Sequence, residues 1–133
     1  MLAAKTEPVA VRPCVLVAHA DAGYAAVAAR AFRRLGWDDY VAGTGPEVRR
    51  LARMLDAAVV VLDVDLAGES GWLTCDKLRR ERPHTRVILV GRQPTPLEHR
   101  LAAFAGACGL VAQTDGVAAL LAALDGTALP AAS

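Results

Sequence analysis

Three short runs of consecutive aliphatic residues stand out along the chain, at Val15–Ala18, Val59–Leu62 and Val87–Val90. Each run is continuous rather than alternating, which is typical of strands that are buried on both faces of a sheet. Tyr40–Ala42 and Gly109–Ala112 are shorter candidates of the same kind. The pattern of hydrophobic positions therefore predicts five short strands.

Amphipathic stretches with helical periodicity separate and follow these runs. They cover Ala22–Leu35, Glu47–Leu55, Trp72–Arg82, Leu97–Gly106 and Val117–Leu124. Thr44 and Thr95 each precede a glutamate by three residues, a pattern that caps the start of a helix. Gly36 follows the first stretch and is a good helix stop. Strands that alternate with helices in this way predict an α/β domain with a parallel sheet covered on both faces.

The length of the chain fits one such domain. It has 133 residues, of which 54% are hydrophobic, so a single sizeable core is within reach. We expect the domain to span residues 13–125. Residues 1–12 are predicted to form a flexible N-terminal tail, and residues 126–133 a C-terminal tail or the start of a linker.

Composition and charge narrow the class of protein. The formal net charge is +1, from 15 basic and 14 acidic residues, so the domain has no overall attraction to nucleic acid or to an anionic membrane. No apolar run approaches the roughly 18 residues that a membrane span needs. Cys14, Cys75 and Cys108 are far apart and odd in number, which favours a reducing, cytoplasmic location over a disulfide scaffold. The 28 alanines, and 13 arginines among the 15 basic residues, indicate a GC-rich bacterial genome.

Two groups of basic residues, at 49–53 and 77–82, fall on the second and third predicted helices. Glu47 and Glu81 dilute their charge, and no aromatic residues are interleaved for stacking on bases. We therefore interpret both groups as solvated helix faces, and we expect this domain to bind neither nucleic acid nor a membrane directly.

The segment Val60–Gly71 resembles the third-strand signature of response-regulator receiver domains, the CheY-like family. In that family a strand ends on a phospho-accepting aspartate, and a loop leads to a glycine that opens the third helix. Val15–Asp21, Val87–Gly91 and Gly106–Gln113 resemble the first, fourth and fifth strand segments of the same family. The resemblance covers nearly the whole chain. It implies a single flavodoxin-like, doubly wound domain whose five parallel strands follow the order 2-1-3-4-5.

Only one of the family's five chemical positions is kept. Asp63 falls on the phospho-acceptor position, whereas His19 and Ala20 fall where the family has its acidic pair. Gly91 replaces the family's serine or threonine, and Gln113 replaces its lysine. Mg²⁺ prefers carboxylate oxygens, so we expect no magnesium cofactor here. The loss of both the ion and the lysine removes most of the charge stabilisation that phosphoryl transfer requires.

We expect these residues to form a pocket at the carboxyl edge of the sheet. It surrounds Asp63 and comprises His19, Ala20, Asp21, Asp65, Gly91 and Gln113. Asp21 and Asp65 could complete a metal site with Asp63, but Asp21 also stands where it would cap the first helix. His19 could pair with Asp63 in a pH-sensitive way or be a polar residue at a strand edge.

The C-terminal part of the chain is poor in charge. Between Leu101 and Leu124 the only charged residue is Asp115. The large apolar residues of this part are Leu101, Phe104, Leu110, Val117, Leu120, Leu121 and Leu124. Exposed apolar surface of this kind marks partner sites. The family also uses its fourth helix, fifth strand and fifth helix to bind partners, so we expect a homodimer, or a protein partner or effector domain, at this surface.

These observations predict an atypical receiver, or pseudo-receiver, in two-component phosphorelay signal transduction. It would act as a protein-interaction module rather than an enzyme, independently of Mg²⁺-dependent phosphorylation. Two alternatives stay open. One is a response regulator that accepts phosphate on Asp63, and the other is a small-molecule sensor whose ligand occupies the emptied acidic pocket.

Overall fold

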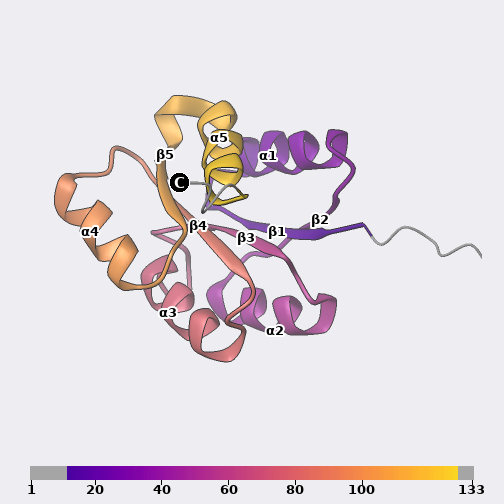
Figure 1. Ribbon diagram of the computed structural model, residues 1–133, viewed down its shortest axis with the longest axis horizontal. Helices are drawn as coiled ribbons and strands as arrows, with labels where there is room; N and C mark the ends of the chain where they lie inside the picture. The colour runs from indigo at the N-terminus through magenta and orange to yellow at the C-terminus, as the bar shows by residue number, and fades with distance from the viewer. Residues whose placement is uncertain (1–11, 129–133) are drawn as a thin grey trace, which may run out of the picture.

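The computed structural model describes residues 12–128 and contains one sheet of five strands (Figure 1). The strands are β1 (Cys14–Ala18), β2 (Asp38–Val41), β3 (Val59–Asp63), β4 (Arg86–Gly91) and β5 (Gly109–Ala112). Their order in the sheet is β2-β1-β3-β4-β5, and every neighbouring pair is parallel. The predicted fold class and strand order are confirmed.

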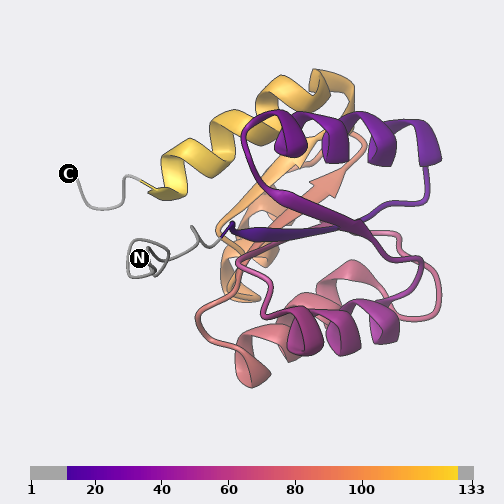
Figure 2. The same ribbon diagram turned by 90° about the vertical axis from the view of Figure 1, so that its right-hand side faces the viewer.

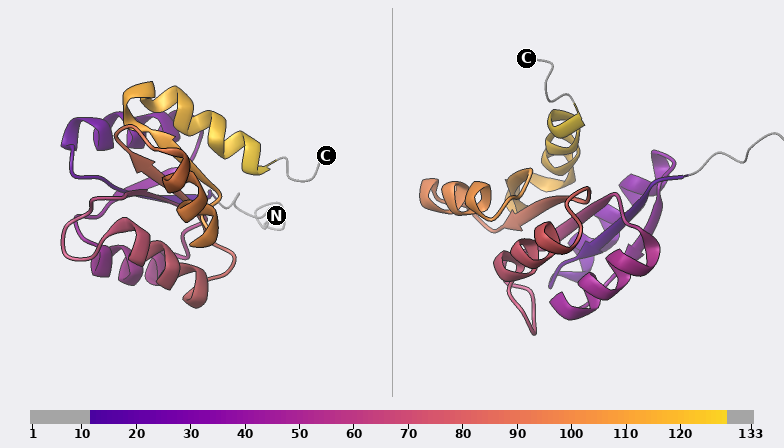
Figure 3. Two further views of the ribbon diagram at one scale, coloured as in Figure 1. Left: turned by 90° about the vertical axis from the view of Figure 1, so that its left-hand side faces the viewer. Right: turned by 60° about the horizontal axis from the view of Figure 1, so that its bottom comes forward.

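Helices cover both faces of this sheet. They are α1 (Ala22–Arg34), α2 (Gly45–Leu55), α3 (Gly71–Glu81), α4 (Pro96–Phe104) and α5 (Gly116–Ala128), with a short 3₁₀ helix, η2 (Gln113–Asp115), before α5. Figures 1 and 2 show α1 and α5 on one face and α2 and α3 on the other. Figure 3 shows α4 at the β5 edge of the sheet. Of its nine residues, only Ala102 is buried, and it belongs to the core on the α2–α3 side.

The core forms where the continuous apolar runs were found. All five residues of β3 are buried, as are all but the first residues of β1 and β4. These three strands are the centre of the sheet, so helices cover both of their faces, and this is why their sequences do not alternate. Phe32 of α1 is fully buried and packs edge-on against Trp37.

The edge strand β2 differs from its prediction. The expected strand was Tyr40–Ala42, whereas the observed strand begins two residues earlier, at Asp38. Its first half is polar because the strand is at the edge of the sheet, where side chains reach solvent and charged partners. Both carboxylate oxygens of Asp39 accept hydrogen bonds from the Arg33 guanidinium, at 3.0 and 2.8 Å. These hydrogen bonds hold the pKa of Asp39 below its usual range.

The ends of the domain also differ from expectation. Helix α5 continues to Ala128, three residues into the segment that was assigned to a C-terminal tail. Of the predicted N-terminal tail only Arg12 is described, and its guanidinium donates to the Gly36 carbonyl at 3.0 Å. Residues 1–11 and 129–133 lie outside the described part of the chain. Within residues 12–128, no helix has the length and apolar character to cross a membrane.

Three residues predicted to line a partner surface are core residues instead. Leu110, Leu120 and Leu124 are buried at 9%, 0% and 6% exposure, because they face the sheet and its helices. Val117 and Leu121 are half-buried against the same core as Leu120. Of the seven residues, only Leu101 and Phe104 of α4 are exposed.

The basic residues of α2 and α3 are more than a solvated surface. Arg49 and Lys77 both contact the carboxylate of Glu69, whose side chain is only 7% exposed in the loop between β3 and α3. Thr74 donates a further hydrogen bond to it at 2.7 Å. Burial alone would raise the pKa of Glu69, but these hydrogen bonds outweigh it and lower the pKa to about 2. The cluster, which we call the Glu69 network, joins α2 to α3.

Candidate functional site

The carboxyl ends of β1 and β3 bring the predicted site residues together. The two strands are neighbours in register, with Ala18 opposite Leu62, so the segment after Ala18 lies beside Asp63. Gln113 follows β5 in η2 and reaches the same edge. The segment after β1, Asp63 and Gln113 thus lie at one edge of the sheet.

Asp63 is the centre of this edge. It is only 6% exposed, and both of its carboxylate oxygens accept hydrogen bonds from the backbone. Oδ2 accepts from the Ala20 amide at 2.9 Å, and Oδ1 accepts from the Asp65 amide at 2.9 Å. The carboxylate thereby connects the loop after β1 to the loop after β3. A buried acceptor with two such donors is satisfied without any cation.

His19 is buried beside Asp63, with 3% of its side chain exposed. Its Nδ1 lies 3.5 Å from Asp63 Oδ2 but accepts a hydrogen bond from the Asp21 amide at 3.0 Å. Nδ1 is therefore engaged as an acceptor with the Asp21 amide, and its contact with Asp63 Oδ2 is the longer of the two. The ring packs against Tyr24 with centroids 4.6 Å apart.

Asp21 caps helix α1. Its Oδ1 accepts from the Gly23 and Tyr24 amides, at 2.9 and 3.1 Å. Its Oδ2 accepts from Gln113 Nε2 at 3.0 Å. The hydrogen bond from the Tyr24 amide is the main cause that lowers the pKa of this carboxyl. The capping role considered for Asp21 is therefore the observed one.

Helix α3 starts directly against the site. A Cβ atom at Gly71 would collide with the carbonyl oxygen of Asp63 and lie 2.8 Å from Val64 Cα, so only glycine fits here. Gly91 ends β4 and is buried, but a Cβ there would meet Pro94 at an ordinary 3.4 Å. The other predicted pocket residues line a hollow beside Asp63, but Gly91 does not.

A hollow of about 140 Å³ opens at this edge. It is lined by His19, Ala20, Asp21, Asp63, Asp65, Arg92 and Gln113. Arg92 was not among the predicted pocket residues. Its position directly after β4 was the available signal, because the carboxyl ends of all parallel strands meet at this edge.

The hollow contains the carboxylates of Asp21, Asp63 and Asp65, but none at the two positions where the family has its acidic pair. Mg²⁺ takes near-octahedral oxygen ligands. His19 and Ala20 supply no carboxylate, and the Asp21 carboxylate is used by the α1 cap and by Gln113. Within residues 12–128, no group of three or more His, Cys, Asp or Glu side chains is placed to hold a metal ion.

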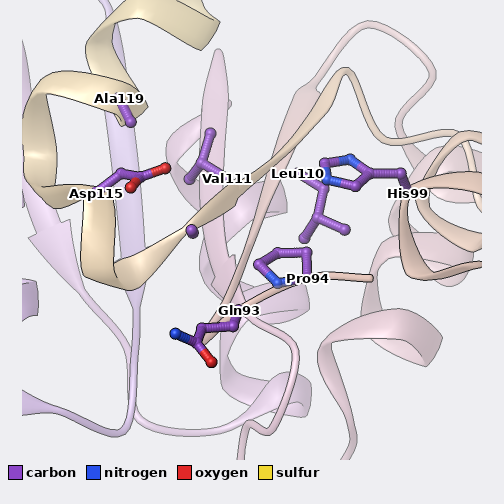
Figure 4. Close-up of a pocket in the computed structure, with 8 residues that line it drawn as sticks. Gln93, Pro94, His99, Leu110, Val111, Asp115 and Ala119 are labelled. Atoms are coloured by element: carbon purple, nitrogen blue, oxygen red, sulfur yellow. The ribbon is translucent and has the colours of Figure 1, made fainter. Parts of the chain in front are cut away.

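A second hollow, of about 410 Å³, lies on the face formed by α4, β5 and α5. Figure 4 shows His99 on one side of it and Asp115 and Ala119 on the other, with Leu110 and Val111 between them. Its lining is partly polar, and Leu110 reaches it although that residue is otherwise buried. The predicted partner face is therefore hollowed rather than a ridge of exposed leucines.

Known proteins resemble this chain in structure but not detectably in sequence. No known family's sequence profile matches the chain, and no curated protein matches it in sequence. Solved structures do match. The chemotaxis protein CheY4 of Vibrio cholerae superimposes with a TM-score of 0.78 at 17% identity, over 86% of this chain and 98% of that one. The receiver domain of the Francisella response regulator 1452 gives 0.78 at 23% identity, over 86% and 94%.

A third similar structure is a response regulator from Burkholderia pseudomallei, described with a phosphorylated aspartic acid, a calcium ion and citrate. Its TM-score is 0.75 at 22% identity, over 90% of this chain and 73% of that one. The matched structures are thus response-regulator receiver domains, and identities in this range establish a shared fold. We conclude that the chain has the receiver-domain, CheY-like fold.

Proposed function

We propose that the chain is an atypical receiver domain that works as a protein-interaction module in two-component signalling, without Mg²⁺-dependent phosphorylation of Asp63. The receiver-type fold supports the first half of this proposal. The second half rests on one observation: the groups bonded to the buried Asp63 carboxylate are neutral backbone amides, and neither an acidic pair nor a lysine stands at the family's positions beside it.

A phospho-acceptor must present one carboxylate oxygen to the incoming phosphorus atom while cations neutralise the phosphoryl oxygens. At Asp63, Oδ2 accepts from the Ala20 amide and lies beside the His19 ring, so the groups bonded to the carboxylate are neutral amides rather than cations. This arrangement supports a structural role for the carboxylate, which keeps the loops after β1 and β3 in one conformation.

Gln113 reinforces this assignment. It stands where the family has a lysine, and its amide group is already engaged, donating to Asp21 Oδ2 at 3.0 Å. An uncharged amide held in this way supplies no positive charge to a phosphoryl group. The signal would therefore be passed by binding to a partner rather than by phosphate.

The small size of the hollow beside Asp63 disfavours the sensor alternative. Sites for small molecules usually enclose about 300–1,000 Å³. The hollow here, at about 140 Å³, has room for a few water molecules. The hollow on the α4–β5–α5 face, at about 410 Å³, is the better candidate for accepting a side chain of a protein partner or effector domain.

Intact-mass spectrometry tests the proposal. The full chain is incubated with acetyl phosphate and Mg²⁺, beside a chemotaxis CheY protein as a positive control. We expect the control to gain the mass of one phosphoryl group and this chain to stay unmodified. A stoichiometric gain that is lost in Asp63→Ala would establish the alternative, a phosphorylated response regulator.

A rebuilt variant sharpens the test. His19→Asp, Ala20→Asp and Gln113→Lys together restore the acidic pair and the lysine of the family at their positions in this chain. We expect this variant to gain phosphate on Asp63 under the same conditions. The contrast between the two proteins would show that the missing cations, and not the fold, keep the natural chain unmodified.

A further inference from the structure

An unpartnered apolar patch lies between α3 and α4, away from the Asp63 site. Phe104, the last residue of α4, is 94% exposed, more than any other large hydrophobic residue in the described part of the chain. Leu97 and Leu101 precede it by seven and three residues and are 56% and 45% exposed. This spacing places all three on one side of the helix, as a continuous stripe.

The stripe borders a hollow of about 370 Å³. The hollow is lined by Trp72, Asp76 and Arg80 of α3 and by Leu101, Phe104 and Ala105 at the end of α4. Beside the hollow, the Cys75 thiol of α3 donates a hydrogen bond to the Ala105 carbonyl, with 3.6 Å between sulfur and oxygen. We call the stripe and this hollow together the α3–α4 patch.

The α3–α4 patch has the properties of a surface that pairs with itself. In a two-fold dimer the same patch meets its own copy, so it must contain both the projection and the recess. Here the projecting Phe104 ring stands at the rim of a recess walled by Trp72 and Leu101.

The charges of the patch are also self-compatible. Asp76 and Arg80 carry opposite signs and already pair at 3.3 Å within α3. After a two-fold rotation, each could face the opposite charge of the other copy. A patch of a single sign would repel its copy, whereas this one is neutral overall.

The area is sufficient for a modest interface. A nearly fully exposed aromatic side chain offers on the order of 200 Å². Leu97, Leu101 and Trp72 extend the apolar surface along two helices, and Asp76 and Arg80 provide a polar rim. The lower end of the range for specific dimers, about 1,200 Å² in total from both copies, is within reach of such a patch.

We propose that a second copy of this chain covers the α3–α4 patch, with Phe104 of each copy inserted in the hollow of the other. This interface uses Leu101 and Phe104, the two exposed residues of the predicted partner surface, but on the α3 side of α4 rather than at β5 and α5, and it does not rest on the proposed function. It leaves the hollow of Figure 4 open to another partner.

Sedimentation velocity of the full chain over a concentration series tests the interface. We expect the wild type to form a dimer at tens of micromolar and Phe104→Ala to raise the dissociation constant at least about tenfold, as is typical of central aromatic anchors. Met54→Ala is the matched control, because Met54 is 65% exposed on α2, outside the patch. Phe104 touches little else in one copy, so a thermal melt of Phe104→Ala at a concentration where both proteins are monomeric should match that of the wild type.

Each other outcome overturns the proposal. A wild type that stays monomeric up to several hundred micromolar has no such interface. A dimer that survives Phe104→Ala, or that Met54→Ala weakens equally, is held elsewhere. A dimer that is instead dissociated by Ala119→Glu, in the hollow between α4, β5 and α5, uses the α4–β5–α5 face.

Discussion

Two buried carboxylates, six residues apart in the sequence, are stabilised in opposite ways. The side chains of Asp63 and Glu69 are 9% and 7% exposed. Glu69 is held by charge, since Arg49 and Lys77 both bind it within 3.2 Å. Asp63 is held by two backbone amides. The carboxylate in the chemically important position of the fold is thus the one without bound cations.

This difference in bonded groups distinguishes a carboxylate that joins two helices from one at the position of the fold's chemistry. At the Glu69 network the positive charges are already in place, but they are used to join α2 to α3. At Asp63 the phosphoryl chemistry of the fold would need such charges on the carboxylate, and the groups bonded to it are neutral amides instead. Substitutions at the two carboxylates should therefore have different energetic and functional consequences.

The largest effect is expected at Glu69. Glu69→Ala leaves two cations next to each other with no carboxylate, so it should lower the free energy of unfolding by about 3 kcal/mol. Glu81→Ala is the matched control because Glu81 also contacts Arg49, at 3.4 Å, but from an exposed position. It should cost less than about 1 kcal/mol. Equal losses in urea denaturation would show that burial of Glu69 does not strengthen its ion pairs.

The same network predicts a pH dependence. The pKa of Glu69 is lowered to about 2 in the folded protein, below its unfolded value near 4.5. Its contribution to stability is therefore complete above about pH 4.5 and is lost as the pH falls toward 2. The difference in unfolding free energy between the wild type and Glu69→Gln should shrink over this window. A difference that stays constant from pH 6 to pH 2.5 would contradict the assignment.

An intermediate effect is expected at Asp63. In Asp63→Asn the amide group must face either the Ala20 or the Asp65 amide, so one buried hydrogen bond becomes a donor–donor contact. We expect a loss of about 2 kcal/mol, measured by thermal or urea unfolding. Asp65→Asn, at an exposed position, should change stability by less than about 0.5 kcal/mol. An Asp63→Asn variant as stable as the wild type would mean that relief of repulsion among the acidic residues offsets the lost hydrogen bond.

The smallest effects are expected at the rim of the site. Asp21→Ala removes the α1 cap and should destabilise the protein modestly, by more than the loss of one exposed hydrogen bond. Gln113→Ala removes only an exposed hydrogen bond to Asp21 Oδ2 and should cost about 0.5 kcal/mol. If Gln113→Ala proves the more destabilising of the two, Gln113 has contacts beyond its bond to Asp21.

The central strands of the sheet could be predicted from the sequence, but the edge strand β2 could not be placed correctly. Continuous apolar runs predicted β1, β3 and β4 because these strands are buried on both faces. The start of β2 was missed because Asp38 and Asp39 read as loop residues, and only the edge position with its Arg33 partner explains them as a strand. The helix caps at Thr44 and Thr95 were predictable because a cap is local.

The sequence predicted where the site residues lie in the fold, but not which atoms their side chains bind. Matching Asp63 and Gln113 to the carboxyl edge needed only the strand order. The direction of each side chain needed the structure, as with Asp21, which turns to the α1 cap. Glu69 gave no local signal, because its partners on α2 and α3 lie up to twenty residues away. Composition also could not distinguish the buried Leu120 from the exposed Phe104.

The amide signals of Ala20 and Asp65 report most directly on the central claim, that Asp63 is a hydrogen-bonded structural carboxylate and not a magnesium-dependent phospho-acceptor. They can be followed in a ¹H–¹⁵N correlation spectrum while Mg²⁺ and then beryllofluoride, a mimic of the phosphoryl group, are added to the full chain. We predict that neither signal shifts, because the hollow lacks the acidic pair and the lysine that would hold Mg²⁺ and a phosphoryl mimic beside Asp63. Saturable shifts of both signals in the wild type would contradict the central claim. In Asp63→Ala, the amide signals of the other residues around the hollow should then stay in place when the same ligands are added.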